Sequence, residues 1–420
     1  MTHSNLIIVP GDKSITHRAL MLAGMARGRS VITGALASLD ARSTGRALRQ
    51  LGVEVSPLAS GRSVTVVGGG RFQVSPNALD CGNSGTTARL LLGLLAAHRF
   101  RTRLTGDRSL RRRPMRRVTE PLALMGARFT PPLADHLPIE IRGGRLAPIE
   151  WSLPVSSAQL KSAVLLAGMA GHVRVAVREP AGLSRDHTER MLKALGFPIE
   201  TRDGWIVLEA GGSVPPFELS VPGDPSSAAF LVGAGLIGNR PVSVARVGQN
   251  PTRLGFVEVL RRMGARITVA PEGEALGEPF GAIHAEPGTL RATVVRADEI
   301  AGLIDEIPLL AVLAARAEGE TRFEQVGELR VKESDRLAQI ATNLTTLGYR
   351  ATGVGNTLTV RGSDHPPRGR IVTDGDHRIA MAFAVLGTVP GARIVLDDRA
   401  CVAVSFPGFF DTLAQARGRR

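Results

Sequence analysis

Two carboxylates in the second half of the chain stand among basic residues. Asp305 lies in Leu303-Ile304-Asp305-Glu306-Ile307-Pro308, a polar start followed by apolar residues that predicts a helix start. Glu333 lies between Lys332 and Arg336, whose four-residue spacing predicts one shared helix face. Carboxylates in cationic surroundings are suited to give and take protons on a bound polyanion. The alternative for Lys332 to Arg336 is a surface ion pair.

A second candidate site lies in Pro10-Gly11-Asp12-Lys13-Ser14-Ile15-Thr16-His17-Arg18, between an apolar strand and an apolar helix of small residues. The first turn of a helix leaves N–H groups unpaired and carries the positive end of the dipole, so it suits an anion. Lys13, His17 and Arg18 are expected near one spot. The alternative is an ordinary capped helix whose basic residues point into water.

Lysine is scarce. Only four of the 52 lysine and arginine residues are lysines, namely Lys13, Lys161, Lys193 and Lys332. Two of the four fall in the candidate sites, which indicates a role for a compact ammonium that a planar guanidinium does not fill.

Further polar stretches resemble the first. Glycines beside Asn, Ser and Thr let a ligand approach the backbone, and a loop rich in arginine can hold a phosphate or carboxylate by paired hydrogen bonds. These stretches are Gly82–Arg89 with Gly85, Gly106–Arg117 with Arg113, Ser156–Gln159 with Ser157, Ser184–Thr188 with Arg185, and Asp374–Arg378 with Arg378. Ordinary N-caps and solvated loops are the alternatives. We expect His187 to cap a helix or lie on the surface, and Cys81 to be a buried thiol.

The polar helix starts recur at a regular period. Asp12, Asn83, Ser157, Asp224, Asp305 and Asp376 are separated by 71, 74, 67, 81 and 71 residues. Each start precedes an apolar helix that should be buried, and amphipathic helices that end in Leu-Gly or Met-Gly alternate with these. A sixth amphipathic helix is degenerate. The pattern predicts six α/β repeats, and if their helix starts converge they build an electropositive cleft. The alternative is that regular α/β units happen to share a length.

Composition and net charge limit the classes of function that this chain can have. A chain of 420 residues should form at least two domains. Its net charge of +14 calls for an anionic partner, but aromatic residues make up only 4 %, which disfavours nucleic acid and favours small anionic metabolites. Two cysteines and the absence of a long apolar run predict a cytoplasmic protein without a membrane span, and no residue cluster has metal-ligand spacing.

The motifs, in this order along nearly the whole chain, resemble those of the 5-enolpyruvylshikimate-3-phosphate synthase family of bacterial type. The resemblance implies an α/β (α+β) fold of two inside-out domains, each with three βαβαββ-like repeats. It also implies transfer of the enolpyruvyl group of phosphoenolpyruvate to the 5-hydroxyl of shikimate 3-phosphate, in the synthesis of chorismate and the aromatic amino acids. No cofactor or metal is expected, and a monomer is expected.

The resemblance also implies residue roles. Shikimate 3-phosphate would bind Lys13, Ser14, Arg18, Ser157, Gln159, Arg185, Asp305 and Lys332. Phosphoenolpyruvate would bind Lys13, Gly85, Arg113, Gln159, Arg336 and Arg378. The catalytic residues would be Asp305, Glu333 and Lys13, with Asp305 as proton acceptor and Glu333 in proton transfer at the methylene carbon.

Because three repeats lie between the two expected crossings, we expect one domain of residues 1–12 and 225–420 and an inserted domain of residues 13–224. Two alternatives stay open at this point. One is the related transferase that acts on UDP-N-acetylglucosamine, and the other is a repeat-built protein that binds nucleic acid without catalysis.

Overall fold

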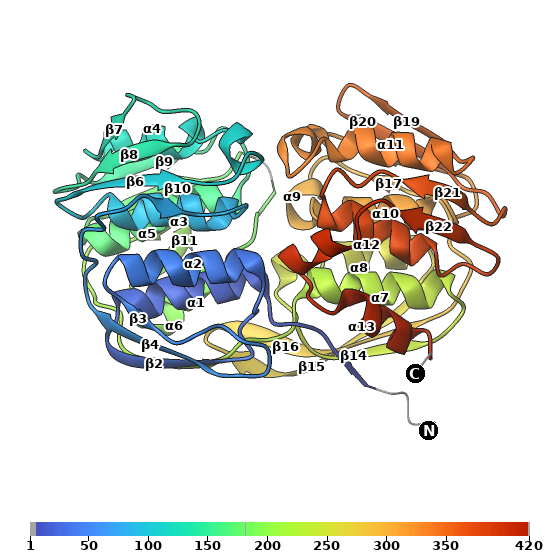
Figure 1. Ribbon diagram of the computed structural model, residues 1–420, viewed down its shortest axis with the longest axis horizontal. Helices are drawn as coiled ribbons and strands as arrows, with labels where there is room; N and C mark the ends of the chain where they lie inside the picture. Colours follow the sequence, from blue (N-terminus) through green and yellow to red (C-terminus); the bar gives the residue numbers. More distant parts are fainter. Residues whose placement is uncertain (1–5, 181, 419–420) are drawn as a thin grey trace. The chain divides into compact units, whose positions relative to one another are not determined.

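The computed structural model describes residues 6–180 and 182–418, and the chain forms two compact units. Unit 1 comprises Met1–Pro10, Pro222–Gly273 and Pro279–Arg420, and unit 2 comprises Gly11–Val221 with Glu274–Glu278 (Figure 1). No helix in the described part of the chain is long and apolar enough to cross a membrane.

Unit 2 contains three four-stranded sheets of one design. Each has one parallel pair of strands, and its other two pairs are antiparallel; the parallel pairs are β2 with β13, β5 with β6, and β9 with β10. The strands are β2 (Arg27–Thr33), β3 (Glu54–Val55), β4 (Val64–Gly69), β5 (Leu79–Asp80), β6 (Arg101–Thr105), β7 (Arg128–Thr130), β8 (Ile139–Arg142), β9 (Ile149–Ser152), β10 (Val175–Arg178), β11 (Ile199–Arg202), β12 (Trp205–Leu208) and β13 (Glu218–Ser220).

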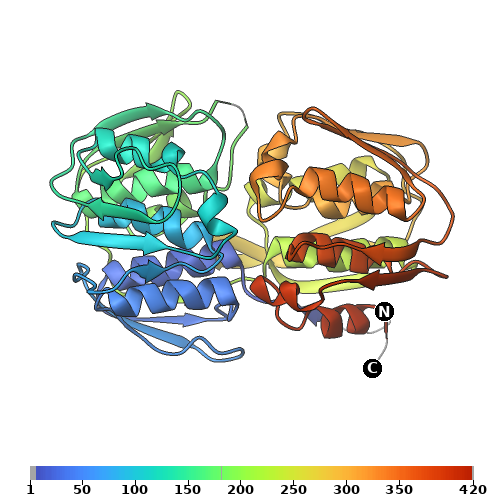
Figure 2. The same cartoon turned by 45° about the horizontal axis from the view of Figure 1, so that its top comes forward.

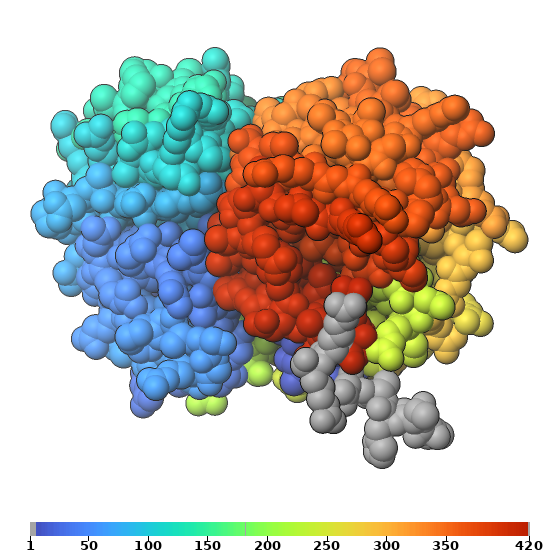
Figure 3. Space-filling model, turned by 45° about the vertical axis from the view of Figure 1, so that its right-hand side comes forward, coloured from blue at the N-terminus to red at the C-terminus, as the bar shows by residue number. Residues whose placement is uncertain are grey.

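Unit 1 repeats this design twice, in the sheets β1-β14-β16-β15 and β17-β18-β20-β19, and then shortens it to the parallel pair β21-β22. The strands are β1 (Ile7–Ile8), β14 (Val242–Gly248), β15 (Arg266–Ala275), β16 (Glu278–Glu286), β17 (Val294–Val295), β18 (Glu320–Phe323), β19 (Arg350–Val354), β20 (Thr357–Arg361), β21 (Arg368–Ile371) and β22 (Arg393–Leu396). The short sixth repeat, in red, occupies the middle of the face of unit 1 that Figure 3 shows.

Six buried helices form the centres of the two units, and Figure 2 shows helices and strands packed together within each unit. They are α1 (Lys13–Met25), α3 (Gly85–Leu95) and α5 (Ala158–Gly171) in unit 2, and α7 (Pro225–Ile237), α10 (Ile307–Ala314) and α12 (His377–Leu386) in unit 1. Their apolar residues pack on the inner faces of the strands. The other faces of most strands are exposed, but β14 is buried on both faces. The expected six-repeat, two-unit α/β fold is confirmed.

Amphipathic helices lie beside the buried ones. They are α2 (Leu39–Gln50), α4 (Arg116–Leu124) and α6 (His187–Ala194) in unit 2, and α8 (Gly255–Arg262), α9 (Ile300–Leu303), α11 (Arg336–Thr346) and α13 (Phe409–Ala416) in unit 1. Short 3-10 turns complete the chain: η1 (Leu110–Arg112), η2 (Pro251–Arg253), η3 (Gly327–Val331) and η4 (Ala400–Val404).

The unit boundaries follow from which sheet each strand joins. β1 pairs with β14 in unit 1, whereas β13 pairs with β2 in unit 2. The units therefore change at Pro10/Gly11 and Val221/Pro222, two or three residues before the expected positions. The expected division also left Glu274–Glu278 in the other domain, because nothing in the sequence signals the hydrogen bond of 2.8 Å between the carboxylate of Glu278 and His187.

Candidate active site

The start of α1 in unit 2 presents Lys13. Asp12 caps the helix, because its Oδ1 accepts a hydrogen bond of 2.9 Å from the N–H of Ile15. The ammonium of Lys13 lies 3.2 Å from Oδ2 of Asp40 on α2. His17 points into the core and shares a hydrogen bond with Thr44, and burial, with Lys13 and Arg18 nearby, lowers its pKa to about 3. A histidine that stays neutral in this way is a structural residue.

Arg18 ties α1 to α5 and α6. Its guanidinium donates to Thr188 Oγ1 at 2.7 Å, to Ser162 Oγ at 2.7 Å and to the carbonyl of Ser14 at 3.0 Å. Nη1 of Arg185 donates to the hydroxyl of Ser14 at 3.4 Å. Burial lowers the pKa of Arg18 to about 10, so it remains a cation at neutral pH. The structure thus brings Ser14, Arg18 and Arg185 together.

The starts of α3 and α5 meet around Gly85. Nη1 of Arg89 donates to Oε1 of Gln159 at 2.6 Å, and Nε2 of Gln159 donates to Thr86 Oγ1 at 3.0 Å. A Cβ at Gly85 would lie 2.7 Å from Arg89 Nη1 and 3.5 Å from Nη1 of Arg113. Backbone N–H groups and two guanidinium groups therefore face one small space, which suits an anion.

Arg113 and Ser157 complete the set that was expected in unit 2. Arg113 follows η1 and is 8 % exposed, and its Nη2 donates to Oδ1 of Asn83 at 2.7 Å. Ser157 is the N-cap residue of α5, but its side chain makes no capping hydrogen bond. We refer to Lys13, Ser14, Arg18, Gly85, Arg113, Ser157, Gln159 and Arg185 as the unit 2 cluster.

In unit 1, three cations surround Asp305. Its Oδ1 lies 3.5 Å from Nη1 of Arg336 and 3.9 Å from Nζ of Lys332, and its Oδ2 lies 3.6 Å from Nη2 of Arg378. Arg378 also donates to the carbonyl of Asp305 at 2.8 Å. These residues and Glu333, whose Oε2 accepts from Arg336 at 2.5 Å, form the unit 1 cluster.

The prediction that Lys332, Glu333 and Arg336 share one helix face is wrong. Asp335 caps α11 by accepting from the N–H of Ala338 at 3.0 Å, so the helix begins only at Arg336. Lys332 and Glu333 lie in the turn before it. The turn nevertheless brings both side chains to the cluster, because the guanidinium of Arg336 reaches back to Glu333 while Lys332 faces Asp305.

Asp376 anchors this cluster and was not predicted to. Nε of Arg336 lies 2.8 Å from its Oδ2, and the two side chains are almost completely buried. Burial alone would lower the pKa of Arg336, but Asp376, Glu333 and Asp305 outweigh it and raise the pKa. Burial alone would raise the pKa of Asp376, but Arg336 holds it below its usual value. The pair is therefore ionised and fixes the orientation of Arg336.

Other contacts in the structure were not predicted from the sequence either. Asp40 and Arg89 hold Lys13 and Gln159. Asp40 stands in an unremarkable helical stretch, and Arg89 ends the polar stretch Gly82–Arg89, where no role was predicted for it. His187 was expected to cap a helix or lie on the surface, but it is the first residue of α6 after the N-cap residue Asp186 and is buried against Glu278. Cys81 is buried as expected, and burial raises the pKa of its thiol. Among residues 6–180 and 182–418, no group of three acidic, histidine or cysteine residues could hold a metal ion.

The chain matches the family model of EPSP synthase (3-phosphoshikimate 1-carboxyvinyltransferase) over residues 3–413. It is 46 % identical to the 3-phosphoshikimate 1-carboxyvinyltransferase of Alkalilimnicola ehrlichii over 412 residues, which are 97 % of this chain and 92 % of the relative. The protein of the same name from Bacillus cereus is 43 % identical over 97 % of this chain and 95 % of its own length.

Solved structures of related proteins also resemble this chain. An EPSP synthase from Acinetobacter baumannii is 40 % identical and superposes with a TM-score of 0.85 over 98 % of this chain and 95 % of its own. The enolpyruvyl transferase NikO from Streptomyces tendae has a TM-score of 0.76 over 98 % and 94 % of the two chains. Its identity is 18 %, so this likeness shows the fold alone.

Proposed function

Because the chain belongs to the EPSP synthase (3-phosphoshikimate 1-carboxyvinyltransferase) family and transfers the enolpyruvyl group of phosphoenolpyruvate to shikimate 3-phosphate, we propose that its two clusters divide the work. The unit 2 cluster and the cations of the unit 1 cluster bind the charged groups of the substrates, and the carboxylates of the unit 1 cluster move the protons. The alternatives with UDP-N-acetylglucosamine or nucleic acid are not favoured.

One observation supports the proton-transfer role most directly. Asp305 and Glu333 both lie against Arg336, within a cluster that also contains Lys332 and Arg378. The distances of 3.5 to 3.9 Å from Asp305 to its three cations exceed those of strong hydrogen bonds. An ionised carboxylate held among three cations at these distances can accept the proton of a substrate hydroxyl.

The reaction needs two proton transfers that these carboxylates can serve. The 5-hydroxyl of shikimate 3-phosphate forms a bond to C2 of phosphoenolpyruvate and gives its proton to Asp305. Glu333 delivers a proton to the methylene carbon. When the C–O bond to phosphate breaks, Glu333 takes a proton back from the new methyl group, and the leaving phosphate takes up the proton that Asp305 holds, so both carboxyl groups return to their starting states. Negative charge changes at the phosphate and carboxylate in both steps, so nearby Arg and Lys side chains stabilise the transition states.

The remaining residues bind the substrates in this proposal. We assign shikimate 3-phosphate to Lys13, Ser14, Arg18, Ser157, Gln159, Arg185, Asp305 and Lys332, and phosphoenolpyruvate to Lys13, Gly85, Arg113, Gln159, Arg336 and Arg378. The contact between Arg185 and Ser14 and the space around Gly85 support this assignment. Arg89 joins the second set as a positioning residue, because it holds Gln159.

The first prediction concerns the reaction itself. The purified protein should release phosphate from phosphoenolpyruvate only when shikimate 3-phosphate is present, because the attacking hydroxyl belongs to that substrate. A phosphate-release assay with and without shikimate 3-phosphate, and with UDP-N-acetylglucosamine in its place, measures this dependence. Phosphate release that is equal with and without shikimate 3-phosphate would contradict the assignment.

The second prediction concerns Gly85. Alanine at this position should raise the KM for phosphoenolpyruvate by about tenfold or more, because a charge-assisted hydrogen bond contributes about 1.5–3 kcal/mol and the added Cβ displaces Arg89 Nη1. The free energy of unfolding should change little, since the displaced atom ends a flexible side chain. Gly288→Ala is the control, because a Cβ there meets open space. Equal KM values in the two variants would remove Gly85 from the phosphoenolpyruvate site.

The third prediction tests whether the ammonium group of Lys13 has a specific role. Lys13→Arg should lower kcat/KM by about tenfold to a hundredfold even though the charge is kept, because a planar guanidinium cannot repeat the hydrogen bonds of an ammonium beside Asp40. Lys193→Arg, at an exposed position of α6, is the matched control. If Lys13→Arg keeps the turnover of this control, Lys13 has no specific role.

A cytoplasmic location and a monomeric state stay predictions from the sequence. The two cysteines are free thiols, which is consistent with a reducing compartment. Light scattering of the purified protein would test the monomer.

A further inference from the structure

A cavity of about 600 Å³ lies in unit 2 at the ends of the buried helices opposite to their starts. Its lining includes Met25, the last residue of α1, and Gly171, the last residue of α5, as well as Ala97 just after α3. At 1.5 Å per residue, the 13 residues of α1 separate Met25 from Lys13 by roughly 18 Å. The cavity is therefore distinct from the unit 2 cluster.

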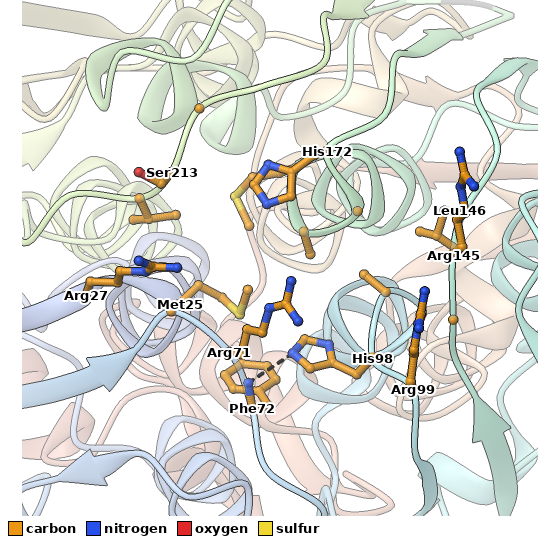
Figure 4. A pocket seen from close by; sticks show the side chains of 18 of the residues that line it. Met25, Arg27, Arg71, Phe72, His98, Arg99, Arg145, Leu146, His172 and Ser213 are labelled. Carbon is orange, nitrogen blue, oxygen red and sulfur yellow. Dashed lines mark hydrogen bonds between the residues drawn. The ribbon is translucent and has the colours of Figure 1, made fainter.

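The wall of this cavity is strongly basic. Arg27, Arg71, Arg99 and Arg145 line it, and none of the lining residues is acidic. In Figure 4 the guanidinium groups of Arg27 and Arg71 point toward the middle of the view, and Arg99 and Arg145 lie at its right-hand side. Within residues 6–180 and 182–418, no carboxylate or carbonyl pairs with these four guanidinium groups. Their charges are therefore available to a ligand.

Each of the three repeats of unit 2 contributes residues of the same pattern to the lining of the cavity. A basic residue follows each buried helix, as Arg27 after α1, His98-Arg99 after α3 and His172 after α5. Three loops with one pattern supply the rest of the wall: Gly69-Gly70-Arg71-Phe72, Gly143-Gly144-Arg145-Leu146 and Gly211-Gly212-Ser213-Val214.

Unit 1 offers an internal comparison. Arg240 and Arg316 follow its buried helices α7 and α10 in the same way. Arg240 donates to the carbonyl of Arg417, and Arg316 donates to the carbonyls of Ser363 and His365. In unit 1 such arginines hold the backbone, whereas the four arginines of the unit 2 cavity do not. A role in holding the backbone after a buried helix therefore does not explain why these four arginines line the cavity.

The inner surface of the cavity is aromatic and neutral. The rings of Phe72 and His98 are stacked with centroids 5.2 Å apart. Nε2 of His98 accepts from the N–H of Phe72 at 2.9 Å, so its Nδ1 carries the proton and donates to the carbonyl of Leu94. Burial lowers the pKa of His98, and the charge of Arg71 acts in the same direction. The ring therefore stays uncharged beside the basic wall.

We propose that this cavity is a second ligand site, which binds a planar aromatic ring that carries phosphate groups, the chemistry of a nucleoside diphosphate. Its phosphates pair with guanidinium groups of the basic wall, which Arg27, Arg71, Arg99 and Arg145 supply, since guanidinium forms paired hydrogen bonds with phosphate. Its ring packs on Phe72, His98 and Met25. The volume lies within the range of small-molecule sites. The proposal does not depend on the assignment of the catalytic residues.

The test is calorimetric titration of the full chain with ADP, with adenosine and with inorganic pyrophosphate. In the variant Arg71→Ser/Arg145→Ser, all three Gly-Gly loops carry the serine that the chain already has at Ser213, so folding should be kept. Arg62→Ser/Arg128→Ser, at two exposed positions outside the cavity, removes the same charge as a control. Phosphate release with saturating substrates should be unchanged in both, which checks their folding.

We expect ADP to bind the wild type and the control with equal affinity, within twofold, and to bind Arg71→Ser/Arg145→Ser at least tenfold more weakly. Arg27→Ser/Arg99→Ser should show the same loss, and it serves as the second variant if the first does not fold. Pyrophosphate should bind more weakly than ADP, and adenosine should not bind. Absence of ADP binding, an equal loss in the control, or an affinity for ADP no higher than that for pyrophosphate would overturn the proposal.

Discussion

Replacement of Asp305 by asparagine should lower kcat by about 10²- to 10⁴-fold, the range over which a positioned general base accelerates a reaction. Asparagine keeps the shape of the side chain but cannot accept the proton of the attacking hydroxyl. The three cations around Asp305 would still hold a polar group, so the KM values and the free energy of unfolding should change far less than kcat. Steady-state phosphate release at saturating concentrations of both substrates measures the effect.

Two further variants make this test specific. Glu333→Gln should also lose most of kcat, because an amide cannot carry a proton to and from the methylene carbon. Asp364→Asn removes a carboxylate of unit 1 at an exposed position and should leave kcat unchanged. A loss of less than tenfold in Asp305→Asn would show that another group accepts the proton.

The largest effect on stability should come from Arg336→Met. This change leaves Asp376 buried without its cation, and loss of one partner of a buried ion pair costs about 3–5 kcal/mol of the free energy of unfolding. Ser334 would still donate to Asp376 at 3.0 Å, but a neutral donor does not balance the charge. The midpoint of denaturant unfolding, followed by circular dichroism, measures the loss.

An exposed pair in the same unit provides the control. Arg322 lies 3.7 Å from Glu324, and the two side chains are 58 % and 34 % exposed, so water screens this pair far more than the buried one. Arg322→Met should therefore lower the free energy of unfolding by about 1 kcal/mol or less. If the two variants unfold at the same denaturant concentration, the pair of Arg336 and Asp376 does not stabilise the protein more than an exposed pair does.

Much of the fold could be predicted from the sequence, because its signals are local. A capping residue such as Asp12 or Asp376 acts on N–H groups two or three residues away, so its helix start is visible in a short stretch. The burial of α1 or α12 follows from the side chains of that helix alone. The near-constant spacing of the starts then gave six repeats. Most residues of both clusters lie at or next to such starts, so they too could be identified.

Only the tertiary structure decided which side chains meet. Asp40, Arg89 and Asp376 each bind a predicted site residue that is at least 27 positions away in the chain. The pairing of His187 with Glu278 joins residues 91 positions apart. Such contacts depend on how helices and strands pack, since neither partner carries a local signal for the other. The sequence by itself thus determined the repeats and the polar helix starts, and packing decided the partners that orient the residues on them.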